Sequence, residues 1–361
     1  MRRRQARRQL LVQTLCLLGA VPSLAGSLSE SHAESSGDLC TSTPAAAATG
    51  QLLVASQDDG SISLIDLASG AINRLEDGGE LHGAAVSPDG RWGVVTDYGR
   101  RRRSEYPARV FDGNTLLVID MAQRRIARRI VVGEHRGVHD VAFVPGSPSR
   151  VVVTAQGNRE IIVVELETGA VVTAVDTRSE GTHSLAIGAD GRTVYTSNEE
   201  EHTVSRIDIA DGVLSGHVAI GGNPLGLAVT ADGTELWVGS RDGALRIFDA
   251  RTGIQRATLE RMGFNDDLAF TPDGKRAVVL DARGGTLRLI DVATRTPVGS
   301  VALPRPSKVA LTPDGRVAFV SLYQDAAVAV VDLEALCVVR RFAVGRNPDG
   351  VGWSPLPVAQ R

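Results

Sequence analysis

This sequence lacks the short motifs by which most catalytic sites are recognised. It has no Gly-x-Ser-x-Gly elbow, no phosphate-binding glycine loop and no His-Glu-x-x-His pair. Cys-x-x-Cys-His is also absent, which excludes a covalently attached c-type haem. The formal net charge of −3 over 361 residues is close to balance, so no nucleic-acid partner is expected.

Long apolar runs are missing as well. The strongest candidate, residues 10–21, is too short to cross a bilayer and follows a basic start that includes Arg7 and Arg8. This order is typical of a signal peptide, here residues 1–33, with an alternative cleavage after residue 25. We expect export by the Sec or twin-arginine route, a periplasmic or secreted protein, and no transmembrane span after signal removal. Residues 34–50 are rich in Ser, Thr and Ala and predict a flexible leader.

Cysteine is scarce, and two of the three residues, Cys40 and Cys337, would remain after export into an oxidising compartment. The two could form one disulfide. The alternative is a free thiol in the leader and a buried cysteine in a strand. The sequence leaves both open, because it does not give the Cα separation that a disulfide needs.

What the sequence does contain is a repeat. An apolar segment that leads into a turn, such as residues 225–233, occurs seven times, and from His183 onward the copies start 41 or 42 residues apart. An apolar run that ends in Asp or Glu also occurs seven times, and we expect this acidic residue to cap the turn that follows. Each repeat divides into four short strands, termed a to d here.

Four strands in about 42 residues is the size of one propeller blade. The predicted fold is therefore an all-β, seven-bladed β-propeller over residues 51–361, with four antiparallel strands per blade. The chain enters the repeat at strand b, residues 52–56, and leaves it at strand a, residues 350–353. The C-terminal strand a should complete the blade begun by the N-terminal strands b, c and d, which removes the free sheet edges.

Several segments also carry a family likeness. The run Tyr195-Thr196-Ser197-Asn198 in a strand b is followed by an apolar strand c at residues 203–208 and a Gly-Gly-Asn-Pro turn at residues 221–224. These features resemble the YVTN-type propeller family, over residues 52–355. The resemblance implies the propeller fold in an exported bacterial protein. It implies little about function, because this architecture includes scaffolds, lactonases, lyases, and haem, copper or quinone enzymes.

Three consecutive repeats begin strand a with histidine, at the position expected to line the mouth of the central channel. His82, His139 and His183 are candidate ligands of one metal ion, since imidazole is the commonest metal ligand, although His82 and His183 lie two blades apart. Asp266 and Asp349 occupy the same position in later repeats and are candidate ligand-binding residues. The alternative is that each histidine hydrogen-bonds a loop carbonyl of its own blade.

A long insertion between strands b and c, residues 97–114, should emerge on the same face. It carries Tyr98 and the run Arg100-Arg101-Arg102-Arg103, whose forked guanidinium groups suit a carboxylate, a phosphate or an acidic partner. The alternative is a solvated loop. The acidic loop at residues 199–201 is expected to be solvated.

Three functions fit these residues. The first is a periplasmic propeller without catalytic activity that binds a small polar or anionic ligand, a metal or a partner protein at its channel mouth. The second is a lactonase- or lyase-type enzyme with one of the three histidines as acid or base. The third is a subunit of a periplasmic redox system that carries a metal or a non-covalent haem. The cofactor is not determined by the sequence.

Overall fold

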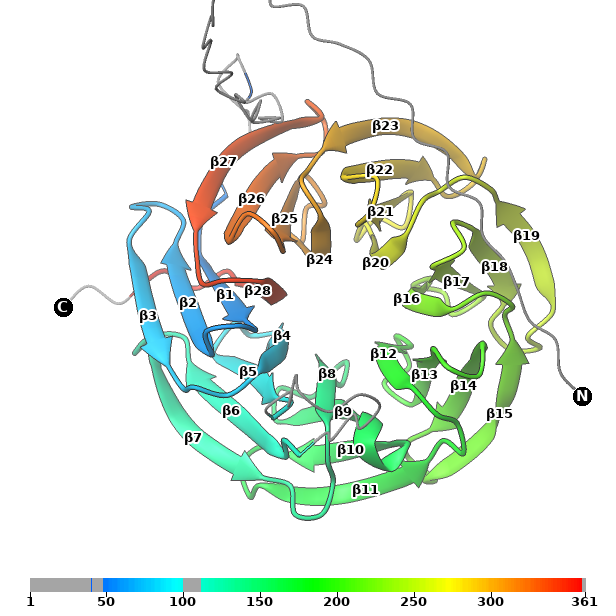
Figure 1. The fold of residues 1–361 in the computed structure, drawn as a ribbon, viewed down its shortest axis with the longest axis horizontal. Helices are drawn as coiled ribbons and strands as arrows, with labels where there is room; N and C mark the ends of the chain where they lie inside the picture. Colours follow the sequence, from blue (N-terminus) through cyan, green and yellow to red (C-terminus); the bar gives the residue numbers. More distant parts are fainter. Residues whose placement is uncertain (1–39, 41–47, 100–111, 359–361) are drawn as a thin grey trace, which may run out of the picture. The chain divides into compact units, whose positions relative to one another are not determined.

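The computed structural model describes residue 40 and residues 48–99 and 112–358. The chain divides into two compact units, Met1–Ser35 and Ser36–Arg361. The first unit, and with it the predicted signal peptide, lies outside the described residues. The second unit holds seven four-stranded sheets that follow one another around a ring (Figure 1). The predicted seven-bladed β-propeller is therefore confirmed.

The blades are antiparallel sheets, numbered here from the blade that contains the N-terminal strand. From the channel outward, blades 1 to 3 are β28 (Pro348–Ser354), β1 (Gln51–Ser56), β2 (Ser61–Asp66), β3 (Ile72–Glu76); β4 (Leu81–Val86), β5 (Trp92–Asp97), β6 (Thr115–Asp120), β7 (Arg125–Val131); and β8 (Val138–Phe143), β9 (Arg150–Ala155), β10 (Glu160–Glu165), β11 (Ala170–Asp176). Blades 4 and 5 are β12 (Thr182–Ile187), β13 (Thr193–Asn198), β14 (Thr203–Asp208), β15 (Val213–Ala219); and β16 (Pro224–Val229), β17 (Glu235–Ser240), β18 (Leu245–Asp249), β19 (Gln255–Leu259). Blades 6 and 7 are β20 (Asn265–Phe270), β21 (Arg276–Asp281), β22 (Thr286–Asp291), β23 (Thr296–Ala302); and β24 (Pro306–Leu311), β25 (Val317–Leu322), β26 (Ala327–Asp332), β27 (Cys337–Ala343).

The ring closes in blade 1. There β28, the last strand of the chain, pairs antiparallel with β1, with Leu53 opposite Gly352. This is the predicted closure, and the predicted entry strand 52–56 corresponds to β1. The described part of the chain has one short helix, η1 (Gln156–Asn158), and no helix in it has the length and apolar character needed to span a membrane.

The core lies between the blades. Seven clusters of buried apolar side chains occur, and each combines residues of two neighbouring blades. In one of them, Val94 and Leu116 of blade 2 pack with Val153 and Ile162 of blade 3. Because burial of apolar surface is the main favourable term in folding, each blade depends on both of its neighbours.

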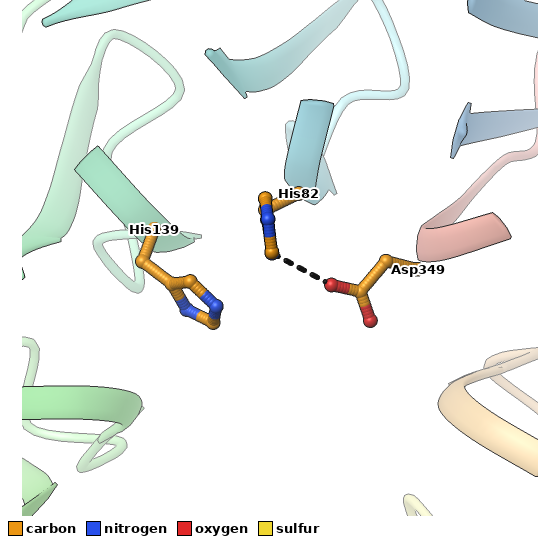
Figure 2. A group of neighbouring side chains, drawn as sticks. All are labelled: His82, His139 and Asp349. Atoms are coloured by element: carbon orange, nitrogen blue, oxygen red, sulfur yellow. Dashed lines mark ion pairs between the residues drawn. The ribbon is translucent and has the colours of Figure 1, made fainter. Parts of the chain in front are cut away.

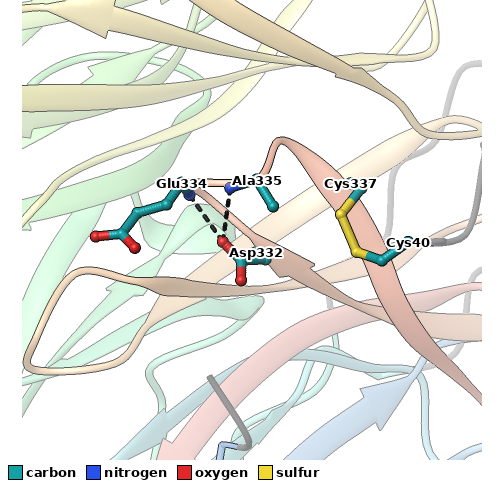
Figure 3. Close-up of a disulfide and its surroundings, with 5 residues drawn as sticks. All are labelled: Cys40, Asp332, Glu334, Ala335 and Cys337. Carbon is teal, nitrogen blue, oxygen red and sulfur yellow. Dashed lines mark hydrogen bonds between the residues drawn. A yellow bond between two sulfur atoms is a disulfide. The ribbon is translucent and has the colours of Figure 1, made fainter. Parts of the chain in front are cut away.

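The seven acidic residues at the ends of the c strands were expected to cap the following turns, and hydrogen bonds to backbone N–H groups confirm this role for the six aspartates among them. Asp332 Oδ1 accepts bonds from the backbone N–H groups of Glu334 and Ala335, both at 2.9 Å (Figure 3). Asp66, Asp208 and Asp249 bind two backbone N–H groups each in the same way. The acidic repeat is thus a structural device and no part of the site.

A disulfide joins Cys40 to Cys337, with Cα atoms 5.4 Å apart (Figure 3). This separation lies in the range that disulfides require. The backbone N–H of Cys40 also donates to the carbonyl of Val338, at 3.0 Å. Cys337 begins β27 of blade 7, whereas Cys40 precedes β1 of blade 1. The covalent link therefore crosses the same blade 7–blade 1 boundary that β28 closes.

Candidate ligand and metal site at the channel mouth

Each inner strand has a β-bulge near its start. In blade 2, Leu81 pairs with Asp97 and Ala84 pairs with Val95, so that His82 and Gly83 both lie opposite Thr96. A register shift occurs at this point in all seven inner strands. A bulge re-aims side chains. It explains why two consecutive residues of one strand can contribute to the channel.

Glycines next to the bulge allow neighbouring inner strands to approach closely. A Cβ on Gly350 would lie 2.4 Å from the carbonyl oxygen of His82, and one on Gly83 would lie 2.6 Å from that of His139. No side chain fits at such distances, so glycine is required at both positions. This close approach brings the residues before the glycines, Asp349 and His82, into contact with each other and with His139.

The three predicted histidines meet at the channel mouth. The ring centroids of His82 and His139 are 4.6 Å apart, and those of His139 and His183 are 4.1 Å apart. The ring of Tyr98 lies 4.5 Å from that of His82. His82 Nδ1 lies 2.9 Å from Asp349 Oδ2, across the boundary between blade 2 and blade 1 (Figure 2). Five sequence-predicted residues thus form one cluster.

Within this cluster, the group that could hold a metal ion differs from the predicted trio of histidines. One ligand atom each from His82, His139 and Asp349 lies within 4.8 Å of the others. His183 is outside this group, and its Nε2 lies 3.5 Å from Glu199 Oε1. Burial lowers the pKa of His183 below its ordinary value. Burial also opposes protonation of His82, but its contacts with Asp349 and Glu80 outweigh this and raise its pKa.

A chain of hydrogen bonds links the two predicted acidic residues through Ser307. Its Oγ lies 2.9 Å from Asp349 Oδ1 and 3.2 Å from Asp266 Oδ2. Burial and the nearby Asp349 raise the pKa of Asp266 to about 7, whereas contact with His82, against the effect of burial, lowers the pKa of Asp349 to about 2. Ser307 has one hydroxyl proton and can donate to only one of the two carboxyl groups. Both contacts are hydrogen bonds when a neutral Asp266 donates to the Ser307 oxygen and Ser307 donates to Asp349.

We expect the variant Asp266→Asn to change how stability depends on pH. The raised pKa means that the folded protein holds this proton more tightly than the unfolded chain, so stability falls as pH rises from about 4 to 7. Asparagine can still donate to Ser307 and has no charge to bury. In urea unfolding of metal-free protein, its stability relative to wild type should be about 2–3 kcal/mol higher at pH 8 than at pH 5. Protonation of His82 affects the stability of wild type and variant equally, so it cancels in the difference between them. An equal difference at both pH values would contradict the argument.

Below the mouth, Lys308 lies among carboxylates from opposite sides of the ring. Its Nζ is 3.9 Å from Asp140 Oδ2 of blade 3 and 3.8 Å from Asp267 Oδ1 of blade 6. Burial raises the pKa of Asp267 to about 6, against the attraction of Lys308. Burial lowers the pKa of Lys308, but the surrounding carboxylates raise it above its ordinary value. The lysine therefore joins non-adjacent blades across the channel.

A second ring of residues surrounds the histidines, and Tyr98 alone of its members was predicted from the sequence as a site residue. It consists of the first residue after each strand b, whose backbone N–H donates to a carbonyl of the preceding d–a loop in every blade: Gln57, Tyr98, Gln156, Glu199, Arg241, Ala282 and Tyr323. The Gln57 amide nitrogen lies 2.8 Å from His82 Nε2 and donates to Glu80, while its oxygen accepts from Tyr323. Tyr98 donates to Gln156 at 2.7 Å. Aligning the seven repeats at the first residue after strand b would have revealed this ring.

The expectation that residues 199–201 are solvated is wrong for Glu199. Its side chain is 9% exposed and pairs with Arg241, with 3.1 Å between Oε2 and Nη2. The reason is its position in the second ring, next to His183. Arg100, Arg101, Arg102 and Arg103 lie outside the described residues, so their predicted role stays a prediction.

Comparison with known proteins supports the fold. A hydrazine synthase structure from Kuenenia stuttgartiensis superimposes with a TM-score of 0.68 at 18% identity, over 79% of this chain and 93% of the other. No family model matches the sequence, and no curated protein matches it. The similarity therefore establishes the β-propeller and leaves the predicted YVTN-type membership as a prediction.

Proposed function

We propose that this chain is an exported binding propeller that holds a divalent transition-metal ion at its channel mouth through His82, His139 and Asp349. The observation that carries the proposal is the convergence of one ligand atom from each residue within 4.8 Å. Imidazole and carboxylate donors suit zinc, copper, nickel and iron. Three protein ligands would leave coordination positions open for a small molecule.

The surroundings of the three residues fit such an ion. His82 and His139 are each 5% exposed, which keeps competing water away from the donors. Asp349 reaches Nδ1 of His82, and Glu80 Oε1 lies 3.5 Å from Nε2, the other ring nitrogen. A carboxylate in that position orients a ligating histidine and increases its basicity. The ion would supply a Lewis acid at the mouth, while the protein's own residues position the ligand.

The exported location is part of this proposal. The basic and then apolar N-terminus supports it. So does the disulfide between Cys40 and Cys337, because disulfides persist in oxidising compartments.

Untagged protein should bind one equivalent of Zn²⁺ or Co²⁺, measured by calorimetry and by the visible absorption of bound Co²⁺. We expect His139→Ala and Asp349→Ala each to weaken binding by about 100-fold or more, because each removes a ligand. Affinity should also fall as the solution is acidified, since His82, whose pKa is raised, must lose its proton to bind.

The matched control is His183→Ala, which removes a neighbouring histidine outside the group. It should change the affinity by less than about tenfold. Circular dichroism would verify that all variants are folded. Absence of stoichiometric binding in the wild type, or equal losses in His183→Ala and His139→Ala, would contradict the proposal.

A further inference from the structure

On the face of the mouth, blades 5 to 7 carry three arginines whose guanidinium groups lie over aromatic rings. Arg241 and Arg283 both lie over Phe264, with Cζ 5.3 Å and 5.2 Å from the ring centroid. Arg305 lies over Tyr323, with Cζ 5.2 Å from the centroid. Stacking restrains a guanidinium group and leaves its N–H edge available for hydrogen bonds.

Two of these arginines keep an uncompensated charge. Glu199 pairs with Arg241 and Asp349 with His82, while the carboxylates deeper in the channel pair with Lys308. Arg283 and Arg305 make no ion pair with a carboxylate in the part of the chain that the structure describes. The positive charge on this side of the mouth is therefore available to a ligand.

Arg305 stands in a turn where glycine is found in other blades. Arg305 has φ 39°, in the left-handed region that disfavours residues with a Cβ. Its carbonyl accepts the bond from the first residue after strand b, as do the carbonyls of Gly137 (φ 65°) and Gly181 (φ 74°) in blades 3 and 4. Glycine would fit this turn without strain. Asn347 holds the same position in blade 1 with φ 52°, so the turn accepts other residues, and Arg305→Gly changes the side chain without disturbing the backbone.

Arg305 is linked to the histidine cluster through neighbouring side chains, and Arg283 lies on the adjacent segment. The backbone N–H of Leu303 donates to the carbonyl of Gly285 at 2.9 Å, which places the two arginine-bearing segments side by side. Tyr323, beneath Arg305, donates to Gln57, whose amide contacts His82. One residue of sequence separates Phe264, beneath Arg283, from Asp266.

We infer that Arg283 and Arg305 form an anion-binding subsite at the mouth and that it takes a small dianion, either a dicarboxylate or a phosphate. Two guanidinium groups match two negative charges, and both anions accept forked hydrogen bonds. This deepens the proposed function by naming the class of ligand. It lies on another part of the mouth than the metal site and does not need the metal.

The test uses full-length protein treated with EDTA and exchanged into low-salt buffer, titrated by calorimetry with succinate and, separately, with inorganic phosphate. The wild type should bind at least one of the two, and the preferred anion identifies the source of the dianion. The double variant Arg283→Gln/Arg305→Gln should weaken binding at least tenfold. Arg251→Gln, which changes an exposed arginine in a c–d turn on the opposite face, should leave it unchanged.

A second variant separates binding from folding. Arg305→Gly suits the left-handed turn and should keep or raise the midpoint of thermal unfolding while it weakens anion binding. The inference is overturned if the wild type binds neither anion, or if Arg251→Gln weakens binding as much as the double variant. Because no metal is present, these outcomes are independent of whether the metal proposal holds.

Discussion

Replacing Lys308 with methionine should lower the free energy of unfolding by about 3–5 kcal/mol, because it leaves buried carboxylates without their counter-charge. Lys308 is 16% exposed and lies within 4 Å of Asp140 and Asp267. The chain offers a matched control, since it contains one other lysine, Lys275, which is exposed. Lys275→Met should change stability by no more than about 0.5 kcal/mol in the same urea titration.

The loss in Lys308→Met should also depend on pH. Burial already raises the pKa of Asp267 to about 6, and removal of the lysine would raise it further. Acidification to pH 5 would protonate this carboxyl and relieve the repulsion, so the destabilisation should be smaller at pH 5 than at pH 8. Equal stabilities of Lys308→Met and Lys275→Met at pH 8 would show that the cross-channel contacts contribute nothing.

The fold was predictable because the repeat occurs seven times and each copy indicates the same four-stranded unit. Seven acidic residues at turn starts and seven apolar strand a segments each indicate the same unit. The order of strands at the two ends predicts closure, and the pairing of Leu53 with Gly352 confirms it. Errors in single strand bounds do not matter when the evidence recurs at a fixed spacing.

The site was predictable in part. Aligning the repeats by strand a placed His82, His139, His183, Asp266 and Asp349 in one column, and they do surround the mouth. The contact of His82 with Asp349 was not predicted, because it depends on glycines at the next position and on β28 lying next to β4 once the ring has closed.

Other features of the site depend on geometry that the alternation of apolar and polar residues along a strand does not reveal. A regular strand sends consecutive side chains to opposite faces, and the bulge breaks that rule for pairs such as Asp266 and Asp267. The second ring, which includes Gln57 and Glu199, lies in loops outside the strand pattern. From the sequence alone, polar residues in short loops are predicted to be exposed to solvent. They become buried because the ring brings the loops of neighbouring blades together.

Removal of the disulfide should lower the stability of the propeller by about 2–4 kcal/mol, or about 5–10 °C in the midpoint of thermal unfolding. Cys40 and Cys337 are 297 residues apart, so the link restricts nearly the whole unfolded chain. The measurement compares wild type, with and without reductant, to the double variant Cys40→Ser/Cys337→Ser. Reductant should destabilise the wild type and leave the double variant unchanged.

The loss of stability on removing the disulfide should be greatest at the seam between blades 7 and 1. There β28 pairs with β1, and the disulfide ties the segment before β1 to β27. Amide hydrogen exchange of β28 and β1 should therefore accelerate more in the double variant than that of blade 4, on the other side of the ring. Uniform acceleration would mean that the link acts on the unfolded chain alone. A gradient away from the seam would show that it also holds closed the ring on which the contact between His82 and Asp349 depends.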